Sequence, residues 1–261
     1  TRSGGAGDFS EVRGHNSAIE AVAIAASGGH HLMMIGEPGS GKTMMASRLP
    51  SILPELGQSD ALTASAIHSI AGDLSSGQLL TEPPHHSMSI PAMVGGGSGV
   101  IRPGAASLAH AGILFLDEAT EFAPAVLDSL RQPLESGWVR IQRSGHTARY
   151  PASFQLVMAT NPCPCGHLGG RIRSCSCSSI QRRRYLARLS GPLIDRIDIT
   201  LSMRVPSQAD LACASHFTSH ALKDKVCEAR ERAAHRLKGT QWRLNRDVAG
   251  SWIRSLHPPS D

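Results

Sequence analysis

The segment GEPGSGKT has the spacing G-x-x-x-x-G-K-[ST] of a phosphate-binding loop. Glycines at these positions let successive backbone N–H groups point toward a phosphate chain, and Lys42 can reach its β- and γ-phosphates. The Thr43 hydroxyl can bind Mg²⁺. A plain Gly-rich turn is disfavoured because the segment lies between an expected strand and an expected helix, so we expect a site for ATP and Mg²⁺. Its expected nucleotide-binding residues are Gly36, Glu37, Pro38, Gly39, Ser40, Gly41, Lys42 and Thr43.

Two adjacent acids follow the apolar run ILFL and form the second candidate group. An aspartate at the end of a buried strand can hold Mg²⁺, and a neighbouring glutamate can polarise the attacking water, which assigns these roles to Asp117 and Glu118. Alone, the pair would be an ordinary strand end with its acids in solvent. With the phosphate loop upstream, it favours ATP hydrolysis, because a kinase would also need a positioned acceptor.

The pattern around these groups predicts an α/β fold with a parallel sheet flanked by helices. Continuous apolar runs, typical of strands buried on both faces, occur at HLMMIG, ILFL and SFQLVMAT, and SGPLIDRIDITL leads into a final strand. Helices are expected at about 15–29, 42–50, 60–70 and 124–135. The segment VRIQRSGHTARY alternates apolar and basic residues around Ser-Gly, which predicts a β-hairpin with one cationic face.

The composition and charge of the chain indicate which partners and cellular location to expect. The chain has 261 residues, 41% of them hydrophobic and 4% aromatic, and a net charge of +5 that neither requires nor excludes a polyanionic partner. The arginine-rich stretch 171–188 is either a nucleic-acid contact or a solvated helix face. No apolar run approaches the roughly 18 residues that span a bilayer, and no signal peptide is recognisable, so we expect a cytoplasmic protein with no membrane partner.

Most of the cysteines lie in one loop, in the pattern NPCPCGHLGGRIRSCSCSS. Disulfides are disfavoured in the reducing cytosol, whereas four thiolates can complete a tetrahedral zinc site. The C-x-C spacing is tighter than the usual C-x₂-C, and His167 is an alternative ligand. We expect structural Zn²⁺, with unligated thiols and redox chemistry as alternatives, and treat Cys213 and Cys227 as packing residues. The expected zinc ligands are Cys163, Cys165, Cys175 and Cys177.

Several longer blocks carry a family resemblance. Besides the phosphate loop and the acid pair, PHHS, VGGGSGVIRPG, SLAHAGILFLDE, LRQPLESG, NPCPCG and LSGPLIDRIDI together resemble the magnesium-chelatase-like AAA+ ATPases of the ComM/YifB group. The resemblance runs from about Asp8 to Val205. It implies a P-loop NTPase of the AAA+ type with a helix-2 insert and a pre-sensor-1 hairpin. It also implies a hexameric ring that acts on DNA as a branch-migration helicase in natural transformation.

The resemblance further implies roles for two residues that the local pattern leaves open. Asn161 matches the sensor-1 position, which reads the γ-phosphate and orients water, although it could equally be a loop-capping residue. Arg196 matches the arginine finger that reaches the ATP of a neighbouring subunit. Without the resemblance, Arg196 would be expected to pair with Asp195 or Asp198.

In relatives the insert (84–100) and the hairpin (139–150) face the channel of the ring. This makes Arg140, Arg143 and Arg149 candidates for DNA contact, although arginines on an exposed hairpin can also serve solubility alone. His85 and His86 would point in opposite directions on a strand, so they do not form a convincing metal pair.

The expected organisation is a flexible linker at 1–7, an AAA+ core at 8–205 and a partial C-terminal helical lid at 206–261. The Lon-protease-like domain of full-length members is not recognised, and Arg243, Arg246 and Arg254 cannot be assigned to the sensor-2 position. Two alternative functions use the same core. One is a chelatase-like protein-remodelling ATPase, and the other is a nucleotide-dependent assembly switch.

Overall fold

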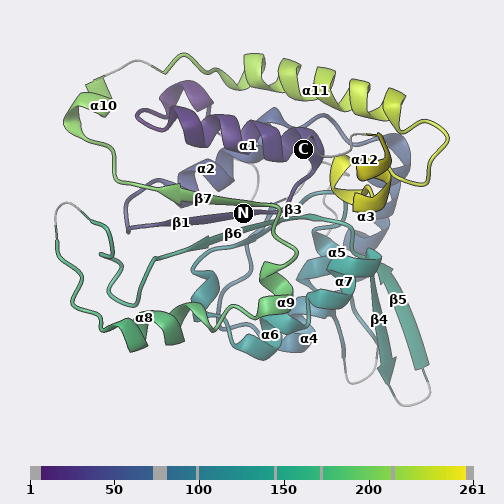
Figure 1. The fold of residues 1–261 in the computed structure, drawn as a ribbon. Coiled ribbons are helices and arrows are strands. Elements are labelled where there is room, and N and C mark those ends of the chain that lie inside the picture. Colours follow the sequence, from purple (N-terminus) through teal and green to yellow (C-terminus); the bar gives the residue numbers. More distant parts are fainter. Residues whose placement is uncertain are drawn as a thin grey trace.

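A five-stranded parallel sheet with the strand order β2-β3-β6-β1-β7 organises the chain (Figure 1). The computed structural model describes residues 7–72, 81–97, 100–143, 146–170, 173–212 and 215–256. The expected α/β fold with a parallel sheet is thereby confirmed. The strands of the sheet are β1 (Leu32–Gly36), β2 (Thr81–Glu82), β3 (Ile113–Leu116), β6 (Gln155–Thr160) and β7 (Ile199–Met203).

Both faces of the sheet are covered, which explains why its central strands are apolar without interruption. Successive residues of β6 alternate between two cores. Val157 and Ala159 pack on the side of α1 and α11, whereas Leu156 and Met158 pack on the opposite side. Figure 1 shows α1, α2 and α11 over one face, and α4, α5, α6, α7 and α9 over the other.

The helices follow the expected pattern with two differences. The helix expected over 124–135 is two short helices, because Pro133 has no N–H to donate to the preceding turn. The helix after the phosphate loop ends at Arg48, and Pro50 lies in a following 3₁₀ turn. The helices are α1 (Asn16–Gly28), α2 (Lys42–Arg48), α3 (Gln58–Ala71), α4 (Ile90–Val94), α5 (Ala105–Leu108), α6 (Pro124–Asp128), α7 (Arg131–Ser136), α8 (Ser179–Leu186), α9 (Gly191–Ile194), α10 (Gln208–Ala212), α11 (Ser219–Arg236) and α12 (Gly250–Leu256).

The predicted hairpin is formed by β4 (Trp138–Arg143) and β5 (His146–Pro151), which project from the body of the molecule (Figure 1). Val139 and Ile141 are buried in the second core and anchor it. Arg140 lies directly opposite Arg149, and both side chains are exposed, which gives the expected cationic face. The side chain of Arg143 and the Ser-Gly turn lie outside the described residues.

The C-terminal segment packs against the body through two partly buried arginines. Helix α11 runs along α1, where Arg230 donates hydrogen bonds of 3.0 and 2.7 Å to the Ala26 carbonyl oxygen. Arg246 donates to the carbonyl oxygens of Gly29 (3.1 Å) and Phe154 (2.7 Å). Within the described part of the chain, no helix is long and apolar enough to span a membrane.

We predict that Arg246→Ala destabilises the protein. It leaves two carbonyl oxygens near the sheet without their donor, and an unsatisfied buried acceptor costs about 1–3 kcal/mol. Chemical denaturation should therefore show a lower free energy of unfolding. Arg243→Ala is the control, because the Arg243 side chain is 80% exposed and its ion pair with Asp60 lies at the surface. Equal stabilities of the two variants would contradict the prediction.

Candidate active site

The predicted nucleotide-binding groups come together at the carboxyl edge of the sheet. The phosphate loop follows β1, Asp117 follows β3, and Asn161 follows β6. These three strands are neighbours in the order β3-β6-β1, and parallel strands all end at the same edge. Residues far apart in the sequence therefore meet at one site.

Lys42 is the most connected residue of the site. Its ammonium donates to the carbonyl oxygens of Gly36 (2.7 Å) and Glu37 (2.9 Å) and to Oδ1 of Asn161 (3.2 Å). The side chain is buried, and this burial lowers the pKa of the ammonium, while the carboxylates of Asp117 and Glu118 act in the opposite direction. The bond to Asn161 ties the phosphate loop to the end of β6.

The two residues expected to hold Mg²⁺ are already in contact. Thr43 donates its hydroxyl proton to Oδ2 of Asp117 at 2.8 Å, and Oδ1 of Asp117 accepts from the backbone N–H of Glu118 at 2.9 Å. Hydroxyl and carboxylate oxygens are the hard ligands that Mg²⁺ prefers. Glu118 has a left-handed backbone (φ 50°) and an exposed side chain beyond the strand end.

The phosphate loop has the shape and donors that a phosphate group requires. Gly39 and Gly41 adopt φ values of 78° and 84°, which side chains rarely tolerate. The Ser40 hydroxyl is fully buried and has no hydrogen-bond partner among the described residues. A buried hydroxyl without a partner is costly, so a phosphate oxygen at this loop would satisfy it. The residues present therefore fit a nucleotide phosphate.

One neighbour of the general-base candidate was not anticipated. Nδ1 of His86 lies 3.8 Å from Oε2 of Glu118, and the rings of His85 and His86 are 4.2 Å apart. His86 comes from the insert, so the insert reaches the carboxyl edge of the sheet. No local sequence pattern signals this contact, because it depends on how the insert folds back.

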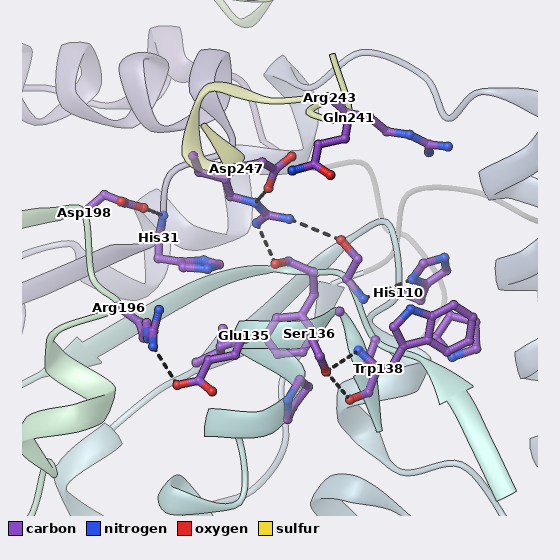
Figure 2. A pocket seen from close by; sticks show the side chains of 18 of the residues that line it. His31, His110, Glu135, Ser136, Trp138, Arg196, Asp198, Gln241, Arg243 and Asp247 are labelled. Carbon is purple, nitrogen blue, oxygen red and sulfur yellow. Dashed lines mark hydrogen bonds and ion pairs between the residues drawn. The ribbon is translucent and has the colours of Figure 1, made fainter. Parts of the chain in front are cut away.

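Arg196 lies at the other end of the sheet. It precedes β7, so it lies near the amino edge, away from the phosphate loop of its own chain. It lines a 780 Å³ pocket and pairs with Glu135 at 2.6 Å (Figure 2). Pairing with Asp195 or Asp198 is thus not observed. Asp198 instead accepts from the backbone N–H of His31 at 2.7 Å.

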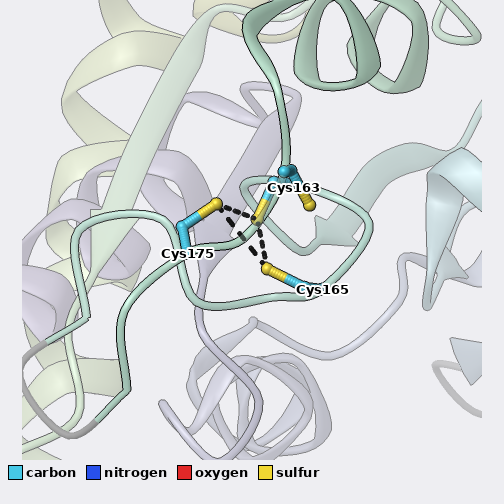
Figure 3. A group of neighbouring side chains, drawn as sticks. Cys163, Cys165 and Cys175 are labelled. Atoms are coloured by element: carbon cyan, nitrogen blue, oxygen red, sulfur yellow. Dashed lines mark hydrogen bonds between the residues drawn. The ribbon is translucent and has the colours of Figure 1, made fainter.

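The four predicted zinc ligands form one cluster, in which all four sulfur atoms lie within 4.8 Å of one another. Figure 3 shows Cys163, Cys165 and Cys175 converging, with Sγ–Sγ distances of 3.4 to 3.6 Å. These distances are too long for disulfides, whose sulfur atoms lie about 2.05 Å apart. His167 does not belong to the cluster of ligand atoms found among the described residues.

The electrostatic environment of two thiols in this cluster differs. The backbone N–H of His167 donates to Cys165 and lowers the pKa of its thiol to about 5. Burial raises the pKa of the Cys163 thiol. Cys227 lies in α11, partly buried and outside the cluster, whereas Cys213 lies outside the described residues.

Residues 8–211 match the family model described as "Magnesium chelatase, subunit ChlI". The chain belongs to this family of AAA+ ATPases. The resemblance inferred from the sequence blocks is thereby confirmed. The family match covers the sheet, the phosphate loop, both acids and the cysteine cluster.

The chain is 46% identical over 260 residues to the uncharacterized protein Rv2897c of Mycobacterium tuberculosis, covering 98% of this chain and 51% of that protein. It is 44% identical over 230 residues to the competence protein ComM of Haemophilus influenzae, covering 86% of this chain and 45% of that protein. The chain therefore spans about half the length of the curated relatives it matches.

A solved complex between the BchI and BchD subunits of magnesium chelatase contains a chain of similar fold. The TM-score is 0.52 with 19% identity, over 88% of this chain and 77% of the other. At this level of identity the similarity shows the fold alone, which agrees with the parallel sheet flanked by helices.

Proposed function

We propose that this chain binds ATP with Mg²⁺ and hydrolyses ATP as the motor core of a DNA helicase. The observation that carries the proposal is the joining of three strand ends by two hydrogen bonds, Lys42 to Asn161 and Thr43 to Asp117. These bonds bring a cation, a hydroxyl, a carboxylate and an amide together beside the glycine-rich loop, a set that supports binding of ATP with Mg²⁺.

Each residue has a distinct proposed role. Lys42 neutralises the β- and γ-phosphates, and Thr43 and Asp117 hold Mg²⁺, which offsets the charge that develops on the transferring phosphoryl group. Glu118 accepts a proton from the attacking water, and Asn161 orients that water. Glu118 is exposed beyond the end of β3, where water can reach its carboxylate, and this supports the proposed role.

We assign Arg196 to a site shared between subunits of a homo-hexameric ring. Arg196 lies near the amino edge of the sheet, opposite to its own phosphate loop, so it is better placed to reach a neighbouring chain. Its pairing with Glu135 is exposed and therefore weak enough to exchange for a phosphate. The related BchI subunit is known in a complex with BchD, which supports an assembly for this fold.

DNA is the proposed partner, and branch migration the proposed use of the motor. The support is the exposed Arg140–Arg149 face of the projecting hairpin and the relative named as a competence protein. Arginines on one exposed face suit contact with the phosphate backbone of DNA. A protein-remodelling ATPase and an assembly switch remain the competing outcomes of the tests below.

A zinc ion at the four cysteines completes the proposed set of cofactors. Four thiols within 4.8 Å of one another provide the soft, tetrahedral donor set that Zn²⁺ prefers. Structural zinc contributes roughly 10–16 kcal/mol to folding, far more than a loop of this kind gains by burying its own side chains.

We predict that Glu118→Gln retains ATP binding and loses hydrolysis. The amide cannot accept the proton of the attacking water, so turnover should fall by about 100-fold or more. ATP hydrolysis and binding of a fluorescent ATP analogue measure the two effects. Glu121→Gln is the control, because Glu121 is also exposed but pairs with Arg188. Turnover of Glu118→Gln at the wild-type rate would rule out this general base.

We predict that the double change Arg140→Glu and Arg149→Glu in the full-length protein abolishes the stimulation of ATP hydrolysis by forked DNA. Removing two phosphate contacts should also reduce the salt dependence of DNA binding by about two slope units. The charge-matched control reverses Lys225 and Arg232, both exposed on α11. If DNA never changes the turnover of the wild type, a protein partner or an assembly switch replaces the helicase proposal.

We predict one zinc ion per chain in freshly purified protein, measured by atomic emission. Cys165→Ser removes one of four ligands and should lower the zinc content to near zero. Cys227→Ser should retain it, because Cys227 lies in α11. Absence of zinc from the wild type, purified without chelators, would contradict the zinc site.

A further inference from the structure

The cysteine loop, residues 162–178, rests directly on the phosphate loop. Gly166 is buried, and a methyl group on its Cα would lie 2.8 Å from Cδ and 2.9 Å from Cγ of Pro38. Only a residue without a side chain can approach the proline ring this closely. A side chain at Gly166, between the second and third cysteines, would therefore displace Pro38.

A second contact lies beside the first. A methyl group at Gly170 would lie 2.4 Å from Oε2 and 2.8 Å from Cδ of Glu37. The Glu37 carbonyl oxygen accepts a hydrogen bond from Lys42 at 2.9 Å. Gly166 therefore packs on the ring of Pro38, and Gly170 lies beside the flexible carboxylate end of Glu37. The first contact is the one that constrains the phosphate loop.

The cysteine loop gains little order from apolar burial. Cys163 is fully buried, but Leu168 is 36% exposed. Among the described residues of the loop, the backbone bonds from Gly166 to Cys163 and from Gly170 to His167 close local turns and do not attach the loop to the sheet. The sulfur cluster is different, because it joins both limbs of the loop, Cys163 and Cys165 to Cys175 and Cys177.

We propose that metal binding at the four cysteines positions the phosphate loop, so that zinc occupancy sets the affinity of the nucleotide site. The cluster holds the two limbs of the cysteine loop together, and Gly166 transmits that position to the ring of Pro38 by direct contact. This inference rests on the proposed ATP and zinc sites. It adds a regulatory link between them, which neither site implies alone.

The link is reciprocal by thermodynamic necessity. If zinc raises the affinity for a nucleotide by some factor, the nucleotide raises the affinity for zinc by the same factor. A zinc ion that only stabilised the fold would leave the nucleotide affinity of the folded protein unchanged. The coupling can therefore be measured on unmodified protein.

The first experiment measures the Kd of a fluorescent ADP analogue with Mg²⁺ for wild type as purified, for wild type stripped by a chelator, and for stripped protein resupplied with Zn²⁺. We expect the Kd to rise about tenfold on stripping, equivalent to ~1.4 kcal/mol, and to recover with zinc. Circular dichroism verifies that the stripped protein remains folded. In the reverse direction, ADP should lower the fraction of zinc that transfers to a competing chelator at equilibrium.

The second experiment uses two glycines with the same backbone conformation. Gly166 and Gly169 have φ values of 81° and 80°, but a methyl group at Gly169 meets nothing within 4 Å. Gly166→Ala and Gly169→Ala therefore carry equal backbone strain, and only the first pushes on Pro38. We expect both to retain zinc and only Gly166→Ala to weaken nucleotide binding, again by about tenfold.

Clear results would overturn the inference. An unchanged Kd in folded, zinc-free protein refutes it while leaving the ATP site intact, as do equal nucleotide affinities of the two alanine variants. If zinc-loaded wild type binds no nucleotide, the proposed function itself fails. Should stripped protein unfold, the effect of ADP on zinc transfer, together with the two alanine variants, decides the question.

Discussion

The pairing of β1 between β6 and β7 is the constraint on which the rest of the structure depends. All three strands run in the same direction, with Leu32 in register with Val157 on one side and Ile199 on the other. A parallel ladder brings every following loop to the same edge. The phosphate loop and Asn161 meet there because of backbone pairing between strands more than a hundred residues apart.

The same ladder separates the phosphate loop from Arg196. Residues that follow strands collect at the carboxyl edge, whereas Arg196, which precedes β7, is held near the amino edge. Because the sheet lies between these two edges, Arg196 cannot reach the phosphate loop of its own chain. The role proposed for Arg196 therefore requires a second copy of the chain beside the first.

The sequence predicted those parts of the molecule that local pattern determines. Apolar runs located the central strands, and the spacing around Lys42 located the phosphate loop, because both depend on neighbouring residues. The break between α6 and α7 also follows from a local signal, the missing N–H of Pro133. The contacts of His86 with Glu118 and of Arg196 with Glu135 could not be predicted, because they join segments distant in the chain.

In the cysteine loop, too, the local pattern predicted the local grouping but not the contact with a distant segment. Its spacing predicted the grouping of four thiols, which the structure places within 4.8 Å. Nothing in the pattern indicated that Gly166 would lie on Pro38, since glycines in a polar loop ordinarily serve turns.

The register of the hairpin places two arginines opposite each other. Arg140 and Arg149 face each other across an antiparallel pair, an arrangement that destabilises a sheet through repulsion between like charges. Stacking of the Arg149 guanidinium over the Trp138 ring, 4.1 Å from its centroid, offsets part of that cost. Counterions or a bound polyanion would reduce the remaining repulsion. The two strands are thus held less firmly at low ionic strength, and an anionic polymer that binds them also rigidifies them.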